Sequence, residues 1–446
     1  MSTTQDVIVT LLTNIGSKKE VEQYLRHYAS PSSPKFAVVR VSGQILDENI
    51  DSLATTLAFL QRVGLLPVVV HGASPQLDRA LVAAGVVAPR VDGLRPMWPE
   101  VRDIARRVLY DVSARLVDAL ESQGTRTRPF TSGVFDAIEE SDAKLGAVAR
   151  VVRVHSAALL SAARSGHLPV ITPLAETEGG RLLVVHADGA ASALAVDLRP
   201  HKVVYLTESG GIREPGGGLR SAINLAEDRD EVFASLSTPD RQRLERIAEM
   251  LAELPKTASV SITSPDHLAK ELFTHRGAGT LVRLGERVGR HTSFAELDKP
   301  RLRALLEECF GKRLHAGYFD SKKPLAVYLA ESYRATAILT LEDGVPYLDK
   351  FAVTPEAQGE GIGGSLWHRL RADHKKLFWR SRANNPVNDW YAQSADGLFK
   401  GDRWWVFFCG MTDFREIESC VKRALQMPAT LKEESPEAAA PRSQAQ

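Results

Sequence analysis

From residue 36 to about residue 290, short apolar runs alternate with segments whose apolar residues recur at helical spacing. Residues 36–41 and 67–71 are almost wholly apolar, as expected of strands that helices cover on both faces of a sheet. Further candidate strands are residues 147–154, 168–172, 182–186, 202–207, 259–263 and 280–283. The alternation predicts the α/β class, with a mostly parallel sheet covered on both faces by helices. The turns after these strands, at Ser42-Gly43 and at residues 72–75 and 209–211, mark the edge where such sheets bind ligands.

The pattern changes after Arg290. Five tryptophans lie beyond this residue and indicate a second core of different composition: Trp367, Trp379, Trp390, Trp404 and Trp405. We expect a first domain over residues 1–291 and a second over residues 292–427. Residues 428–446 are rich in Glu, Ala, Pro and Ser, so we expect them to form a disordered tail.

A glycine-rich turn follows a strand-like run in the second part of the chain. Residues 347–353 are rich in aromatic and β-branched side chains, and residues 358–363, QGEGIG, lead into an amphipathic helical segment. A strand, a glycine-rich turn and a helix start place backbone N–H groups at one concave spot that suits a pyrophosphate. Glycine matters there because a Cβ would hold phosphate oxygens away from the amides. Many loops before helices are glycine-rich only to make a turn, so the motif alone leaves both interpretations open.

Composition narrows the partners and the compartment. Lys and Arg number 56 against 55 Asp and Glu, and no basic block stands out, so neither nucleic acid nor an anionic membrane is an expected partner. The three cysteines form no CxxC pair, which favours a reducing compartment. No basic segment followed by an apolar core begins the sequence, and no apolar run reaches membrane-spanning length. We expect a soluble, cytoplasmic protein that needs no metal.

Several stretches resemble vertebrate-like N-acetylglutamate synthases and bifunctional N-acetylglutamate synthase–kinases. The matching stretches are residues 310–314 (FGKRL), 347–351 (YLDKF), 358–363 (QGEGIG) and 377–391 (LFWRSRANNPVNDWY), and they span most of residues 300–425. The resemblance implies an amino-acid-kinase-like αβα sandwich followed by an α+β acetyltransferase domain of the GNAT type. The kinase-like part covers roughly residues 17–290 and carries altered motifs.

For the second domain, the resemblance implies transfer of an acetyl group from acetyl-CoA to L-glutamate. The residues it selects for acetyl-CoA are Phe351 and Val353, through their backbone amides, and Gln358, Gly359, Gly361 and Gly363 around the pyrophosphate. The residues it selects for glutamate and catalysis are Lys350, Arg382, Lys312, Asn385 and Tyr391. Tyr391 is expected to protonate the departing thiolate. We expect Arg380 and Arg382 to point to opposite faces, and we assign the substrate to Arg382.

Each of these side chains also has an ordinary structural interpretation. Lys350 would then be a solvated charge at a strand edge, Arg380 and Arg382 an ion-pairing couple, and Tyr391 a core aromatic. The combination of all of them with the glycine-rich turn, in order, favours the acetyltransferase interpretation.

The kinase-like part departs from its family where phosphoryl transfer takes place. The family carries a lysine in the first strand followed by two glycines, where this chain has Arg40-Val41-Ser42-Gly43, and Ala73 and Ser74 replace two glycines of the next loop. A second lysine has no counterpart, although Arg95 and Asp188 persist. Because a compact ammonium and a guanidinium are not interchangeable at such a site, we expect no kinase activity. The alternatives are a bifunctional synthase–kinase, an acetyltransferase for another amino acid, or a non-catalytic arginine-binding regulator.

The resemblance also implies that arginine is an effector. Tyr24 on an N-terminal helix, and His267, Glu271 and Gly277 near the end of the kinase-like part, are the candidates for its site. The other interpretation of the second stretch is a helix that ends at a glycine before a strand. The N-terminal helix of this family commonly mediates association, so we expect a homo-oligomer, as a dimer of dimers.

Overall fold

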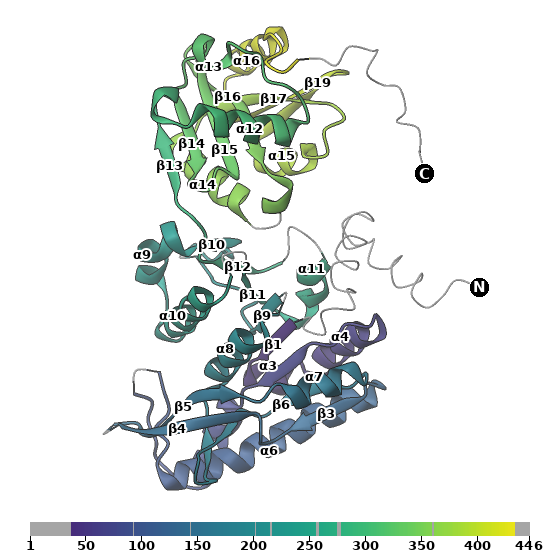
Figure 1. Ribbon diagram of the computed structural model, residues 1–446, viewed down its shortest axis with the longest axis vertical. Coiled ribbons are helices and arrows are strands. Elements are labelled where there is room, and N and C mark those ends of the chain that lie inside the picture. The colour runs from purple at the N-terminus through teal and green to yellow at the C-terminus, as the bar shows by residue number, and fades with distance from the viewer. Residues whose placement is uncertain are drawn as a thin grey trace, which may run out of the picture. The chain divides into compact units, whose positions relative to one another are not determined.

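The computed structural model describes residues 37–432, apart from residues 92, 143, 201, 215, 256–257, 274–277 and 359–360. The chain divides into two compact units, Met1–Gly285 and Glu286–Gln446 (Figure 1). The division falls ahead of the boundary expected near residue 291. The reason is that β13 (Val288–His291) pairs with β14 (Ala326–Ala330) of the second unit.

The first unit is built on an eight-stranded sheet in the order β10-β12-β11-β9-β1-β2-β6-β3. Its strands are β1 (Ala37–Val41), β2 (Val68–His71), β3 (Thr127–Phe130), β6 (Leu168–Ile171), β9 (Lys202–Leu206), β10 (Ala222–Asn224), β11 (Val260–Thr263) and β12 (Thr280–Arg283). Every neighbouring pair is parallel except β11 and β12. The predicted α/β class with a mostly parallel sheet is confirmed.

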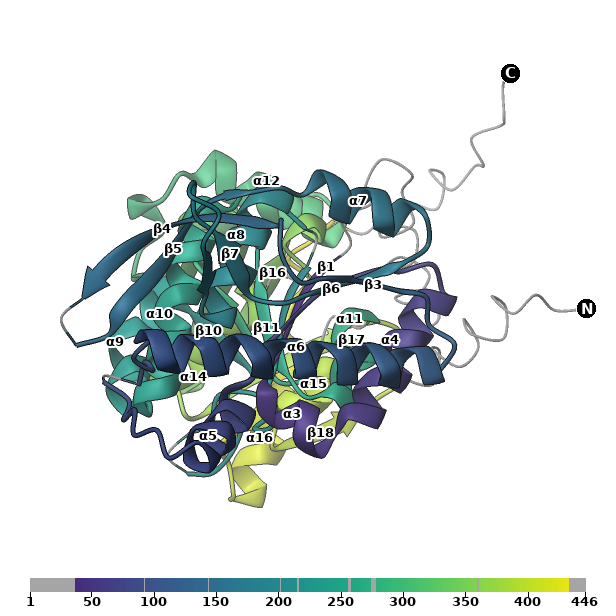
Figure 2. The ribbon, with the colours of Figure 1, turned by 90° about the horizontal axis from the view of Figure 1, so that it is seen from below.

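Helices cover both faces of this sheet because alternate strand residues are apolar on both sides. The helices of the first unit are α3 (Gly43–Glu48), α4 (Ile50–Arg62), α5 (Ser74–Ala83), α6 (Pro99–Ser122), α7 (Ala157–Arg164), α8 (Ala187–Leu198), α9 (Leu225–Ser235), α10 (Thr238–Glu253) and α11 (Leu268–Phe273). Val39 and Val41 of β1 pack with α4 and α6, whereas Val38 packs with α7 and α8 on the other face. Figure 2 shows α6 and α7 on opposite sides of β3 and β6.

A second, four-stranded sheet departs from the expected simple repeat. It consists of β4 (Phe135–Asp142), β5 (Gly146–Val154), β7 (Leu174–Glu176) and β8 (Leu182–Val184), in the order β5-β4-β7-β8. The predicted strands at residues 147–154 and 182–186 therefore lie outside the main sheet. β4 and β5 form an antiparallel hairpin in which no residue of β5 is fully buried, so their pattern lacks the continuous apolar run of the buried strands.

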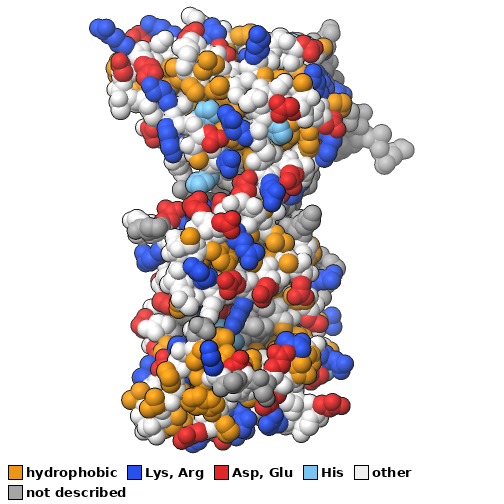
Figure 3. Space-filling model, turned by 90° about the vertical axis from the view of Figure 1, so that its left-hand side faces the viewer, with side chains coloured by type: hydrophobic (Ala, Val, Ile, Leu, Met, Phe, Trp, Pro, Cys, Tyr) orange, Lys and Arg blue, Asp and Glu red, His pale blue; other side chains and the backbone are white. Residues whose placement is uncertain are grey.

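The second unit has a mixed seven-stranded sheet in the order β13-β14-β15-β16-β17-β19-β18. The remaining strands are β15 (Ala335–Glu342), β16 (Val345–Val353), β17 (Leu377–Arg382), β18 (Gly397–Lys400) and β19 (Trp404–Cys409). The helices are α12 (Lys299–Phe310), α13 (Tyr318–Ser321), α14 (Ile362–Asp373), α15 (Asn388–Ser394) and α16 (Phe414–Gln426). α14 and α15 pack on one face of this sheet, and α12, α13 and α16 pack on the other. Figure 3 shows charged side chains of both signs interspersed on the visible face of each unit.

Candidate active site

A β-bulge in β16 forms the centre of the site. Ile338 pairs with Lys350 and Leu339 pairs with Leu348, so Asp349 has no partner in β15. Successive side chains of a regular strand point to opposite faces, but an inserted residue lets two neighbours share one face. Lys350 and Asp349 do so: Lys350 Nζ lies 2.7 Å from Asp349 Oδ2, and the side chains are 5% and 4% exposed.

A partly buried second lysine and a buried tyrosine complete this cluster. The Tyr318 hydroxyl donates to Asp349 Oδ2 at 2.6 Å, and Lys322 Nζ lies 3.4 Å from Asp349 Oδ1. Burial alone would raise the pKa of Asp349, but the charges of Lys350 and Lys322 outweigh it and lower the pKa to about 2. Burial also lowers the pKa of Lys350, and Asp349 opposes that change. Two ammonium groups therefore face one carboxylate, and this cluster carries a net positive charge that a second carboxylate could balance.

Lys350 has a third partner beyond the last helix. Its Nζ donates to Asp349 Oδ2, to the Asp349 carbonyl oxygen at 3.1 Å and to Thr430 Oγ1 at 2.6 Å. Thr430 falls inside the tail expected from residue 428, yet Leu431 next to it forms a β-bridge with Leu314. Residues 428–432 thus belong with the second unit, because the carbonyl of Thr430 and the N–H of Lys432 bond the backbone of His315 and Arg313 there.

β16 and β17 diverge beside this cluster. They pair in parallel at Tyr347 and Phe378, after which β17 pairs along its length with β19. On the edge of β16 that faces β15, the N–H of Thr354 donates to the carbonyl oxygen of Arg334. By the alternation of an antiparallel ladder, the N–H groups of Phe351 and Val353 then point away from β15, to the side where β17 has diverged.

The glycine-rich turn brings α14 close to β16. Gly361 precedes α14 with a φ of 78°, a left-handed conformation that suits glycine. A Cβ at Gly363 would lie 3.2 Å from Val353 Cγ2, so glycine lets the first turn of α14 approach the strand. Gln358 Nε2 donates to the Val353 carbonyl at 3.4 Å. Gly359 lies outside the described residues. No side chain caps the start of α14, so its first N–H groups can receive an anion.

Tyr391 lies in α15, among aromatic rings. Its ring centroid is 5.4 Å from those of both Trp379 and Phe407, and 6.5 Å from that of Phe351. Burial raises the pKa of the Tyr391 phenol, so the group stays protonated at neutral pH. Asn385 bonds Ser381 Oγ at 2.9 Å and accepts the N–H of Val387, so it shapes the turn between β17 and α15.

The arginines of β17 do not point to opposite faces, and that expectation was wrong. Residues two apart along a strand share a face, and the guanidinium groups of Arg380 and Arg382 lie 4.3 and 5.1 Å from the ring centroid of Trp404. Arg380 donates to the carbonyls of Ala424 and Pro428 at 2.7 and 3.0 Å, so it holds the segment after α16. Lys312 is partly exposed in the turn after α12.

In the first unit, an ion pair lies beneath the expected ligand edge. Arg40 Nε is 2.5 Å from Asp188 Oδ1, although the N–H is not aligned for a hydrogen bond, and both residues are buried. Burial opposes ionisation of Asp188, but the charges of Arg40, His186 and Arg243 outweigh it and lower the pKa to about 2. Ser42 donates to Glu208 Oε2 at 3.1 Å. Arg95 pairs with Asp78.

The candidates for the arginine site are described only in part. Glu271 is 6% exposed and accepts hydrogen bonds from Ser261 Oγ at 2.6 Å and from the N–H of Ala278 at 2.8 Å. His267 Nδ1 lies 3.1 Å from Ser264 Oγ. Tyr24 and Gly277 lie outside the described residues. The contacts of Glu271 tie α11 to β11, and the binding of arginine there stays a prediction.

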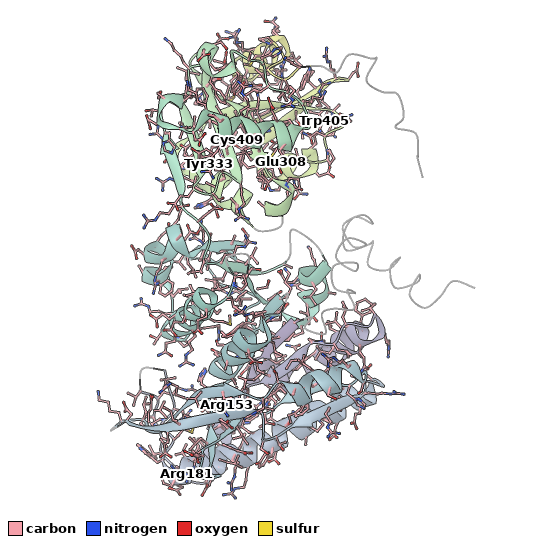
Figure 4. The ribbon with its side chains drawn as sticks, viewed as in Figure 1. Arg153, Arg181, Glu308, Tyr333, Trp405 and Cys409 are labelled. Atoms are coloured by element: carbon pink, nitrogen blue, oxygen red, sulfur yellow. The ribbon has the colours of Figure 1, made fainter. Side chains whose placement is uncertain are left out.

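Within the described ranges, we find no helix long and apolar enough to cross a membrane. The same residues hold no group of three or more His, Cys, Asp or Glu side chains placed to bind a metal ion. Cys309, Cys409 and Cys420 are all free thiols, and Cys409 is fully buried in β19 (Figure 4).

Comparison with known proteins identifies both units. Residues 35–240 match the amino acid kinase family, and residues 289–427 match the NAT family, described as the N-acetyltransferase of N-acetylglutamate synthase. The chain is 43% identical to a Xanthomonas campestris protein named acetylglutamate kinase, over 94% of this chain and 100% of that one. It is 35% identical to human mitochondrial N-acetylglutamate synthase, over 88% of this chain and 72% of the relative.

A solved structure shares the fold. The N-acetylglutamate synthase of Neisseria gonorrhoeae, complexed with coenzyme A and N-acetyl-glutamate, gives a TM-score of 0.61 at 22% identity, over 88% of this chain and 98% of that one. The same enzyme has been solved with coenzyme A and L-arginine, with a TM-score of 0.55 at 21% identity and the same coverage. The chain belongs to the family of N-acetylglutamate synthases and kinases in which an amino acid kinase domain precedes an N-acetyltransferase domain, and it is itself an N-acetyltransferase.

Proposed function

We propose that this enzyme transfers the acetyl group of acetyl-CoA to the α-amino group of L-glutamate, the opening step of arginine biosynthesis. The observation that carries the proposal is the cluster in which Lys350 and Lys322 share Asp349 as their one carboxylate partner among the described side chains. Buried charges need partners, so the cluster favours an acceptor that brings a carboxylate. Glutamate offers two, and Arg382 and Lys312 are the proposed cations for the other.

The donor site is proposed beside the divergence of β16 and β17. The outward N–H groups of Phe351 and Val353 would bind the pantetheine and the thioester carbonyl. Gln358 and the glycines at positions 359, 361 and 363 would hold the pyrophosphate at the start of α14.

In the proposed reaction, the neutral amine of glutamate attacks the thioester carbonyl. The C–N bond forms as the oxyanion develops, and donors aimed at that oxygen stabilise it. Collapse breaks the C–S bond, and the thiolate takes the phenolic proton of Tyr391. The nitrogen loses its extra proton to solvent, and the Tyr391 phenolate regains a proton from solvent. Asn385 positions Tyr391 by holding the turn that leads into α15.

The test is acetylation by the full chain of a panel of amino acids with acetyl-CoA, followed by thiol release. We expect glutamate to have the highest kcat/KM, and Lys350→Met to raise the KM for glutamate while that for acetyl-CoA stays constant. A higher kcat/KM for a monocarboxylic amino acid would overturn the choice of glutamate.

We further propose that the kinase-like unit transfers no phosphoryl group. Arg40 pairs with Asp188 at the position of the family's lysine, where a guanidinium replaces a compact ammonium. The second candidate function, an additional N-acetylglutamate kinase, is favoured by the name of the X. campestris relative, which matches over its whole length. Measuring ADP release from MgATP and N-acetylglutamate decides between the two functions. We expect the wild type to release no ADP. ADP release by the wild type that is lost in Asp188→Asn would establish the kinase.

Arginine is the proposed effector, with Tyr24, His267, Glu271 and Gly277 as the proposed contacts, and the protein is proposed to be a cytoplasmic homo-oligomer. The free thiols support a reducing compartment. Glu271→Gln tests the effector site, since it is expected to weaken the response of glutamate acetylation to added arginine. Light scattering of the full chain measures the assembly.

A further inference from the structure

The segment after α16 lies on the same side of the second unit as the lysine cluster. We call residues 428–432 the strap. Arg380 holds its first carbonyl, at Pro428. Further along, Leu431 forms an antiparallel bridge with Leu314, flanked by the N–H of Lys432 donating to Arg313 at 2.9 Å and that of His315 donating to Thr430 at 3.3 Å. The strap is therefore held at both ends, with Thr430 between them.

Thr430 accepts the third hydrogen bond that the Lys350 ammonium can donate. An ammonium has three donors, and those of Lys350 go to the carbonyl and carboxylate oxygens of Asp349 and to Thr430 Oγ1. A carboxylate can therefore bind Lys350 only if one of these partners withdraws. The Asp349 carbonyl belongs to β16, and its carboxylate is also bound by Tyr318 and Lys322. Thr430 is the neutral partner, and it lies outside any helix or strand.

We propose that the strap is a gate on the acceptor site, in which the Thr430 hydroxyl occupies the place on Lys350 that an acceptor carboxylate takes. The proposal rests on the proposed function, since it assigns Lys350 to the acceptor. A carboxylate displaces the hydroxyl because charge-assisted hydrogen bonds are about twice as strong as those to neutral groups. An amino acid that cannot place a carboxylate at Lys350 leaves the strap closed, so the strap contributes to acceptor specificity.

The first test removes the competitor without removing the strap. Thr430→Val keeps the shape of the side chain and loses the hydroxyl. It is expected to lower the KM for glutamate by roughly tenfold, the size of one hydrogen bond to a charged group, with the KM for acetyl-CoA unchanged. Thr430→Ser keeps the hydroxyl and is expected to restore the wild-type value. A rise in the KM for glutamate in Thr430→Val would show that Thr430 supports acceptor binding, and would overturn the gate.

The second test locks the strap. Leu314 and Leu431 face each other as a non-hydrogen-bonded antiparallel pair, whose Cα atoms lie about 4.5 Å apart, within disulfide range. The double variant Leu314→Cys/Leu431→Cys, once oxidised, is expected to bind glutamate at least tenfold more weakly in calorimetry, and reduction is expected to restore binding. Each single cysteine variant controls for pairing with Cys309.

The two tests separate the gate from the proposed function. Absence of glutamate acetylation by the wild type would overturn the function. Glutamate binding to the variant with the locked strap is measured without turnover, so it does not depend on that result. Equal glutamate affinity of the oxidised and reduced forms would overturn the gate and leave the acetyltransferase assignment intact.

Discussion

At the scale of single residues, Tyr391 combines a packing role with a chemical one. Replacing it with Phe keeps the ring among Trp379 and Phe407 and removes only the phenolic proton. We expect kcat to fall by about 100-fold, the lower end of general acid catalysis, with little change in either KM. Steady-state kinetics measure this, and an unchanged melting temperature controls for packing. Wild-type kcat in Tyr391→Phe would exclude this side chain as the acid.

Asp349 is expected to control the pH range in which Lys350 binds the acceptor. Its negative charge raises the pKa of Lys350 against the lowering effect of burial. In Asp349→Asn that support is lost, so the pKa of Lys350 falls further and the ammonium is lost at a lower pH. The alkaline limb of kcat/KM for glutamate should therefore move to lower pH, measured at saturating acetyl-CoA. A limb that stays in place would show that Lys350 is not the titrating group.

At the scale of elements, the contact between α14 and β16 depends on one glycine of a pair. A Cβ at Gly363 would lie 3.2 Å from Val353 Cγ2, whereas a Cβ at Gly364 meets nothing within 4 Å. Both replacements by Ala gain helix propensity, roughly 0.5–1 kcal/mol. We expect Gly363→Ala alone to raise the KM for acetyl-CoA several-fold, because α14 must move from the strand that carries the donor amides. Equal KM values in the two variants would contradict this.

The elements also show which features the sequence could predict. Continuous apolar runs predicted the buried parallel strands of the first unit, and the glycine-rich turn was placed correctly between β16 and α14. The bulge at Asp349 interrupts the alternation of side chains between the two faces of β16, and no sequence pattern marks it. Lys322 and Thr430 reach Asp349 and Lys350 only through the tertiary fold. An Asp beside a Lys in an otherwise apolar strand was the signal that the sequence offered. The Glu-, Ala-, Pro- and Ser-rich composition of residues 428–446 predicted a disordered tail, so the contacts of the strap were not predicted.

At the scale of the whole molecule, the division after Gly285 determines which fragment of the acetyltransferase unit can fold. β13 pairs with β14 from Val288 to His291, and Val288 is buried in the core of the unit. Glu286 bonds the N–H of Ser332 at 2.8 Å and pairs with Arg334 at 3.1 Å. A fragment that begins at residue 292 loses all of these contacts and leaves β14 as an unpaired edge strand.

Two fragments, residues 286–446 and 292–446, test this placement directly. An exposed edge strand with apolar residues promotes pairing with other chains. β14 carries such residues, among them Val327 and Leu329. We expect the longer fragment to stay monodisperse in size-exclusion chromatography and to unfold cooperatively, and the shorter one to aggregate and melt at a lower temperature. Matching elution and melting of the two fragments would mean that β13 adds no stability, and would place the functional boundary near residue 291 after all.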